Sequence, residues 1–218
     1  MKNTVAILFI VLASNVNAQE LWLGVKATPQ FSWLGVTGNS AAAKGSQTGL
    51  DFGLVVEKYY NANYAFKTGI SISTNGGTVA YNDTVTLGFN NGLYTLLPAQ
   101  EVNYKIQYVN VPVSMLLKSN PLGSVAIYAE MGIKAMLRAK ASAKTETPDN
   151  LSKTQDAKEE IKPFNIAYFV GTGVEASLGG NTSARFGIGY ANGFLDLSKN
   201  EKDNLSLNIM SVQLELMF

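Results

Sequence analysis

The 218-residue sequence contains no cysteine and no histidine. The absence of cysteine excludes disulfide bonds, so hydrogen bonds and packing alone must hold the fold together. The absence of both residue types excludes Ser-His-Asp and Cys-His nucleophilic catalysis. It also excludes zinc and copper sites built on these side chains. We therefore expect no enzyme activity, no catalytic residue, no metal site and no cofactor.

An excess of charge and a long apolar run are lacking as well. The 17 basic and 16 acidic residues nearly cancel, so no nucleic-acid partner is indicated. Beyond residue 18 there is no apolar stretch of about 18 residues, which excludes a membrane-spanning helix. A membrane protein without such a helix must be a closed β-barrel, because an open sheet edge leaves backbone groups unpaired in lipid.

Residues 1–18 have the features of a cleaved export signal. Lys2 supplies a positive start, an unbroken apolar run fills residues 5–13, and Ala18 ends a small-residue cleavage site. The run is too short to cross a bilayer as a helix, which takes about 20 residues. We predict that this segment is removed and that residues 19–218 form a single domain.

Eight segments of the remaining chain alternate apolar and small or polar residues. A period of two places successive side chains on opposite faces of a β-sheet. Most of these segments are longer than the roughly 5–6 residues of a typical strand, and long enough to cross a bilayer. The eight predicted strands are residues 21–32, 48–58, 64–74, 104–117, 125–140, 164–178, 183–195 and 205–218.

The two faces of these predicted strands differ in chemistry. In the second strand Leu50, Phe52 and Leu54 share one face. Asp51 and Glu57 share the other. A soluble barrel would hide its apolar face and expose a charged one. The small and oppositely charged residues on the polar face instead suit a narrow interior, which indicates an exterior that faces lipid.

Two predicted strands change which face is apolar. The change follows Tyr108 in the fourth strand and falls between Ile209 and Met210 in the eighth. We interpret these positions as strand ends above the membrane or as β-bulges.

The connections between the predicted strands alternate in length. The long ones are residues 33–47, 75–103, 141–163 and 196–204, and the short ones are residues 59–63, 118–124 and 179–182. Outer-membrane barrels have short periplasmic turns and long outer loops. The sequence therefore predicts an all-β fold: an eight-stranded antiparallel up-and-down transmembrane β-barrel with both termini periplasmic, four long outer loops and three short turns.

Nine charged residues are predicted to face the interior. They are Asp51, Glu57, Lys67, Glu130, Lys134, Arg138, Glu175, Arg185 and Glu215. One hypothesis is a proton- or ion-handling site. The favoured one is a structural network that plugs the barrel, because eight strands enclose a space just wide enough for side chains. Charges buried there should pair with charges of opposite sign.

The last predicted strand ends in an aromatic residue. Val212, Leu214 and Leu216 alternate up to Phe218. This ending resembles the last-strand signal that the barrel-assembly machinery reads. The expected partners are that machinery, outer-membrane lipid and envelope proteins of unknown identity.

Five short motifs follow one another along the chain: LGVKA at 23–27, YVNVPV at 108–113, YAEMG at 128–132, GTGVE at 171–175 and RFGIGY at 185–190. In this order they resemble the PorT-type outer-membrane β-barrel family of Bacteroidetes. The resemblance implies an eight-stranded barrel and little about activity, since most members have no assigned one. A few members serve protein secretion and gliding, and nothing in this sequence singles out that role.

These observations predict an outer-membrane barrel with a structural or interaction role in the cell envelope and no catalysis. Two alternatives remain open. One is a narrow porin or small-solute transporter, and the other is a soluble periplasmic barrel that binds a ligand.

Overall fold

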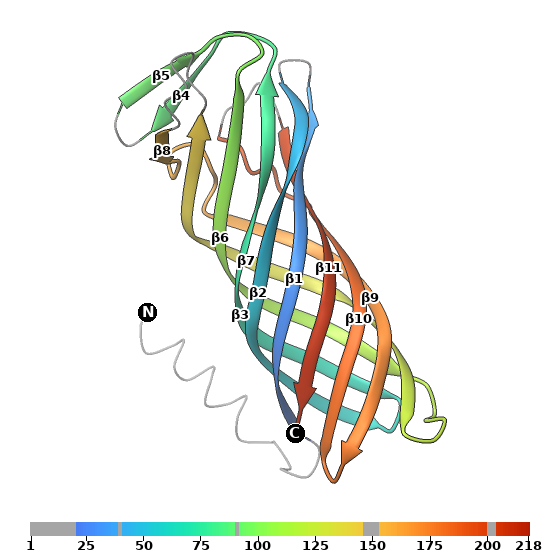
Figure 1. The fold of residues 1–218 in the computed structure, drawn as a ribbon. Helices are drawn as coiled ribbons and strands as arrows, with labels where there is room; N and C mark the ends of the chain where they lie inside the picture. Colours follow the sequence, from blue (N-terminus) through green and yellow to red (C-terminus); the bar gives the residue numbers. More distant parts are fainter. Residues whose placement is uncertain (1–20, 39–40, 90–91, 146–152, 200–203) are drawn as a thin grey trace, which may run out of the picture.

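A computed structural model describes residues 21–38, 41–89, 92–145, 153–199 and 204–218. The predicted export signal lies outside these residues. Eight long antiparallel strands form a closed barrel (Figure 1). They are β1 (Leu21–Thr37), β2 (Ala41–Asn61), β3 (Tyr64–Tyr81), β6 (Glu101–Lys118), β7 (Val125–Thr145), β9 (Phe164–Gly179), β10 (Thr182–Gly193) and β11 (Asn204–Met217). Neighbours follow chain order, and β1 pairs with β11 to close the ring, which confirms the predicted up-and-down barrel.

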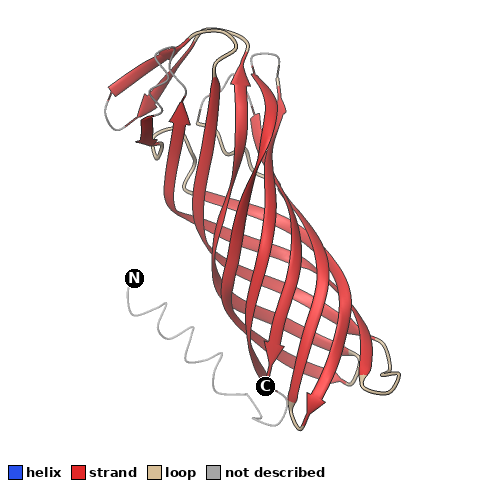
Figure 2. Ribbon diagram, in the orientation of Figure 1, coloured by secondary structure: helices blue, strands red, loops and turns tan. Residues whose placement is uncertain are grey.

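Three shorter strands lie at one end of the barrel (Figure 2). β4 (Val85–Phe89) and β5 (Gly92–Leu96) pair with each other as a separate hairpin. β8 (Lys153–Asp156) pairs with the last residues of β7. In the described part of the chain, no helix is long and apolar enough to cross a membrane.

The two ends of the barrel are different. At the turn end lie the connections β2–β3, β6–β7 and β9–β10, together with the first and last described residues. There Leu23 and Phe218 exchange backbone hydrogen bonds of 3.1 and 2.8 Å. At the opposite, loop end lie the four other connections. Which end faces the periplasm stays a prediction.

The strands run further toward the loop end than predicted from the sequence. The predicted bounds of three loops were therefore wrong, because strands occupy much of each one. Residues 33–47 are almost all strand, because Trp33 pairs with Ser46 and only residues 38–40 connect β1 to β2. The predicted loops 75–103 and 141–163 likewise contain the ends of long strands and the whole of β4, β5 and β8. Polar and charged residues such as Ser46, Lys105 and Lys140 are exposed on the outside of these extensions, so the apolar exterior that marks a membrane strand is missing there.

In β6 the alternation between inside and outside is continuous, but the chemistry of the two faces reverses along the barrel. In β6, Tyr104 and Tyr108 are buried inside near the loop end, and Asn110 and Ser114 take the same inward positions further down. Met115, by contrast, is exposed on the outside. The predicted face changes after Tyr108 and at Ile209–Met210 mark this reversal. A register shift opposite Gln107 and Tyr108 adds a bulge at the same level of β6 and β7.

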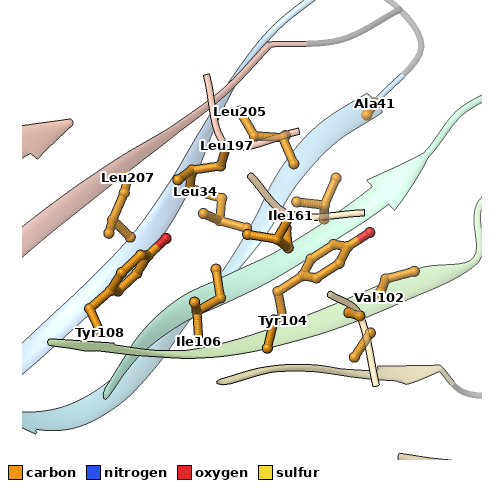
Figure 3. Close-up of a cluster of buried hydrophobic side chains, with 14 of the residues drawn as sticks. Leu34, Ala41, Val102, Tyr104, Ile106, Tyr108, Ile161, Leu197, Leu205 and Leu207 are labelled. Atoms are coloured by element: carbon orange, nitrogen blue, oxygen red, sulfur yellow. The ribbon is translucent and has the colours of Figure 1, made fainter. Parts of the chain in front are cut away.

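An apolar core fills the loop end (Figure 3). Leu34, Tyr104 and Ile106 in this core have 0–1% of their surface exposed. Two connecting segments, 157–163 and 194–199, complete the wall around it. The amide of Ala157 donates to Ala141 (3.0 Å), the amide of Leu197 donates to Leu205 (2.8 Å), and Ile161 bridges to Ser198. The loop end is therefore a small water-exposed barrel with its own core, built on the transmembrane part.

Leu34→Asp tests whether this core is a separate structural unit. An unpaired carboxylate buried there is strongly unfavourable, so the extension should open while the transmembrane strands stay closed. We expect trypsin to cleave the loop end at least tenfold faster, with the heat-dependent gel shift of the barrel unchanged. Thr37→Asp, on the exposed outside of β1, is the control. Equal cleavage rates for the two variants would contradict the assignment.

Candidate functional site

Ten charged side chains are held together in the lumen between the apolar core and the turn end. Each of the eight barrel strands contributes at least one, because inward positions recur at every second residue. They are Lys26, Asp51, Glu57, Lys67, Lys118, Glu130, Lys134, Glu175, Arg185 and Glu215. Five are basic and five are acidic, so their formal charges cancel.

Arg185 is the centre of the larger group. Its guanidinium forms a bidentate ion pair with Glu57, in which Nη2 donates to Oε2 at 2.9 Å and Nη1 donates to Oε1. Its Nε donates to Glu175 at 2.6 Å, and Nη1 also lies 3.3 Å from Glu215. Only 3% of Arg185 is exposed. Arginine suits this position because its planar fork of donors can satisfy several carboxylates at once.

Lys67 joins the opposite wall to this group. Its Nζ donates to Glu130 at 2.9 Å and to both carboxylate oxygens of Glu215 at 2.7 and 2.8 Å. Glu215 therefore bridges Lys67 and Arg185. Ser114 donates to the other oxygen of Glu130 at 2.7 Å, so both oxygens of that carboxylate have partners.

Tyr59 and Lys118 complete the group toward the turn end. The Tyr59 hydroxyl donates to Glu57 (3.2 Å) and accepts from Arg185 (3.1 Å) and Lys118 (3.3 Å). Lys118 also donates to Glu175 at 2.5 Å. Every charged head group here is held by at least one partner of opposite sign, which offsets the cost of removing the charges from water.

A smaller group lies nearer the loop end. Asp51 accepts from Lys26 at 2.9 Å and from Gln30 at 3.5 Å, and its carboxylate is 3.6 Å from Nζ of Lys134. A cavity of about 50 Å³ lies among these side chains. One water needs about 10–15 Å³ of cavity volume, so this cavity has room for a few waters and for no larger ligand.

The structure brings eight of the nine predicted interior charges into these two groups. Arg138 is the exception, and its predicted place in the network was wrong. Its Nη1 donates to the carbonyl oxygens of Lys158 (2.7 Å) and Ile161. Beyond Lys134, β7 rises into the apolar core, so the Arg138 side chain reaches the closing segment instead of another charge.

Sequence reasoning missed Lys26, Lys118 and Tyr59. Lys26 has the same parity as Thr28 and Gln30, both buried, so the alternation of the first strand could have placed it inside. Lys118 was assigned to a short turn, although it continues the inward series of Asn110 and Ser114. No local pattern distinguishes the buried hydroxyl of Tyr59 from an interfacial aromatic residue.

The chemistry open to this arrangement is narrow. Each carboxylate of the larger group lies against a cation, which leaves none placed as a free general base. In the residues that the structure describes, no group of three or more acidic, histidine or cysteine side chains could hold a metal ion. The arrangement can exclude water and tie opposite walls of the barrel together.

Comparisons with known proteins agree with the fold. A family model described as outer membrane protein beta-barrel domain matches residues 14–199. Among curated proteins there is no match.

Solved structures of similar shape include three outer-membrane proteins. Neisserial surface protein A is 12% identical, with 89% of this chain and 95% of that chain covered and a TM-score of 0.47. OprG from Pseudomonas aeruginosa is 7% identical, with 94% and 99% covered and a TM-score of 0.48. The protease OmpT from Escherichia coli is 6% identical, with 93% and 97% covered and a TM-score of 0.48. At these values the three structures carry no argument about function.

Arg185→Met tests the network. Removing the cation leaves Glu57, Glu175 and Glu215 with fewer partners, and breaking a buried ion pair from one side costs about 3–5 kcal/mol. The free energy of unfolding, measured by urea titration in detergent micelles, should fall by that amount. Lys44→Met, at an exposed position of β2, should change it by less than about 0.5 kcal/mol. A similar small change for both variants would show that the network does not stabilise the barrel.

Proposed function

Because the chain belongs to the outer membrane protein beta-barrel domain family, we propose that it has a structural or interaction role in the cell envelope, as a closed barrel without catalysis. The protein is an outer-membrane β-barrel. Its exterior between the two ends carries exposed apolar side chains such as Phe52, Ile72 and Ile188, each 58–61% exposed. That belt suits lipid, so the soluble periplasmic alternative is wrong.

The main support for this proposal is that side chains fill the lumen both near the loop end and near the turn end. The apolar core around Tyr104 fills the loop end, and the ion pairs of Arg185 fill the turn end. Between them the cavity among Lys26, Asp51 and Lys134 is only about 50 Å³. A solute would have to break buried ion pairs and displace an apolar core to pass. This geometry favours a closed barrel over a narrow porin.

Planar-bilayer recording separates these two alternatives. We expect no reproducible conductance steps from the purified, heat-modifiable protein, because the apolar core and the ion pairs of the described residues fill the lumen. A porin of known conductance, purified in the same detergent, controls for insertion. Reproducible steps of constant size from this protein would contradict the closed barrel and support the transporter alternative.

An interaction role requires a surface that meets other molecules. The loop-end extension supplies one, since β4 and β5 form a hairpin beside the barrel and the Thr86 side chain is exposed. In cells, a photo-crosslinker at Thr86 should give discrete protein adducts. The same group at Ile127, which is 59% exposed on the apolar belt, is the control and should give none. A lack of adducts from Thr86 would argue for a purely structural role.

The finer family assignment is also a proposal. We propose that the chain is a PorT-type barrel of Bacteroidetes, on the order of the five motifs. Two of them, at 171–175 and 185–190, lie on the neighbouring strands β9 and β10. Alignment with characterised PorT-type barrels should place the five motifs on the same five strands in the same order. If the motifs fall on other strands or in another order in those proteins, the assignment to PorT-type barrels is wrong.

Phe218→Ala tests whether the assembly machinery reads the last strand. Phe218 pairs through its backbone with Leu23, and the residue is 54% exposed. The substitution keeps the backbone pairing, so refolding in detergent should be unaffected. Assembly in cells, measured as the heat-modifiable fraction in outer membranes, should fall severalfold. Loss of refolding as well would indicate a packing role instead.

A further inference from the structure

Three lysines share one patch on the outer wall near the loop end. Lys105 lies on β6, and Lys140 and Lys144 lie on the adjacent strand β7. Gln107 pairs with Lys140, and Lys105 pairs with Ser142, midway between the two β7 lysines. Diagonal neighbours of this kind are about 7–8 Å apart, within reach of long side chains. The three ammonium groups can therefore approach a single anionic group.

These lysines differ from those of the lumen. Lys26, Lys67, Lys118 and Lys134 all form ion pairs inside the barrel. Within the part of the chain that the structure describes, none of the three patch lysines forms one, and all three are exposed. The positive charge of the patch is thus available to a partner outside the protein.

Among the residues that the structure describes, two carboxylates border the patch. Asp156 pairs with Ser142 through the backbone, and its carboxylate lies 3.5 Å from Lys158. Glu101 shares a hollow of about 290 Å³ with Lys144. Lys105 and Lys140 lie on the membrane side of that hollow, where their partners across the β6–β7 pair are the uncharged Ser142 and Gln107. The net positive charge is therefore greatest on the side that faces the membrane.

The height of the patch matches the lipid headgroups. Val109 and Leu137 form the last apolar pair on the outside of β6 and β7, and the pair Gln107–Lys140 follows directly. At about 3.3 Å per residue, Lys140 and Lys105 stand roughly 7–13 Å above that pair along tilted strands. The polar region of a bilayer adds about 5–8 Å on each side of its hydrocarbon core. Both side chains therefore end at or just above headgroup depth.

The same end of the barrel carries aromatic side chains on its other strands. The ring of Tyr190 on β10 lies between two others. Its centroid is 6.4 Å from that of Trp33 on β1 and 6.4 Å from that of Tyr168 on β9. Trp33 and Tyr190 come where the apolar exterior of their strands ends, which is where interfacial aromatic residues occur. On β9 the exposed Phe164 lies beyond Tyr168, toward the loop end. The outer wall near the loop end thus carries aromatic side chains on β1, β9 and β10 and basic side chains on β6 and β7.

We propose that Lys105 and Lys140, flanked by Lys144, bind the phosphate of an outer-leaflet lipid headgroup. The ammonium groups supply the charge, and the apolar exterior below Val109 and Leu137 lies alongside the acyl chains. The proposal goes beyond the closed-barrel function. It rests on the predicted orientation that places the loop end outside the cell.

Native mass spectrometry of the detergent-purified protein tests the proposal, with lipid A as the anionic probe and phosphatidylcholine, whose phosphate charge is balanced by its own choline, as the zwitterionic reference. We expect tighter binding of lipid A. Each lysine at an anionic membrane surface contributes roughly fivefold, so Lys105→Gln/Lys140→Gln should weaken lipid A binding about 30-fold. Added salt should weaken the wild-type interaction by screening.

The matched control is Lys44→Gln/Lys199→Gln, which removes two exposed loop-end lysines outside the patch. It should bind lipid A within about twofold of the wild type. Equal loss in both double variants, or no preference for lipid A over phosphatidylcholine, would overturn the proposal. Competition by millimolar inorganic phosphate would also overturn it, because the site would then bind free anions. Conductance is measured separately, so a conducting barrel would refute the proposed function and leave this result standing.

Discussion

The transmembrane part of this chain must make every backbone hydrogen bond within the protein, because lipid offers no alternative partner. The pairing of β1 with β11 meets that requirement by closing the ring. Closure then fixes the rest of the structure. Eight strands enclose a narrow space, side chains alternate between lipid and lumen, and the inward side chains must fill the lumen themselves.

The lumen is filled by pairs that connect distant parts of the chain. Arg185 of β10 reaches Glu57 of β2, 128 residues away, and Lys67 of β3 reaches Glu215 of β11, 148 residues away. A buried ion pair is weak evidence for stability in itself. These pairs cross the barrel, however, so each satisfies a charge on one wall only when the opposite wall is in register. The network thereby specifies one arrangement of the eight strands.

The sequence predicts the part of the barrel that lies in lipid better than the part in water. Alternation around Leu50, Phe52 and Asp51 was sufficient for strand number, facing and most of the interior charges. Alternation was not sufficient near the loop end, where the inner face of the strands becomes apolar and the outer face becomes polar. Residues 33–47 were assigned to a long connection although almost all of them form strand, and Arg138 was assigned to the network because alternation does not show where the lumen turns apolar. Residues 33–37 pair with 204–208 of β11 and residues 41–46 pair with 77–81 of β3, whereas Arg138 bonds to segment 157–163. Local alternation shows none of these contacts.

The central claim is that the lumen is sealed at both ends. Since the chain has no cysteine, a single introduced thiol reports access directly. Ser73 is 1% exposed and lies between the apolar core and the larger ion-pair group, whereas Thr86 is exposed on the loop-end hairpin. A charged maleimide should label Thr86→Cys within minutes and leave Ser73→Cys unlabelled from either side of a membrane vesicle until the barrel is unfolded. Rapid labelling of Ser73→Cys in the folded protein would contradict a sealed lumen.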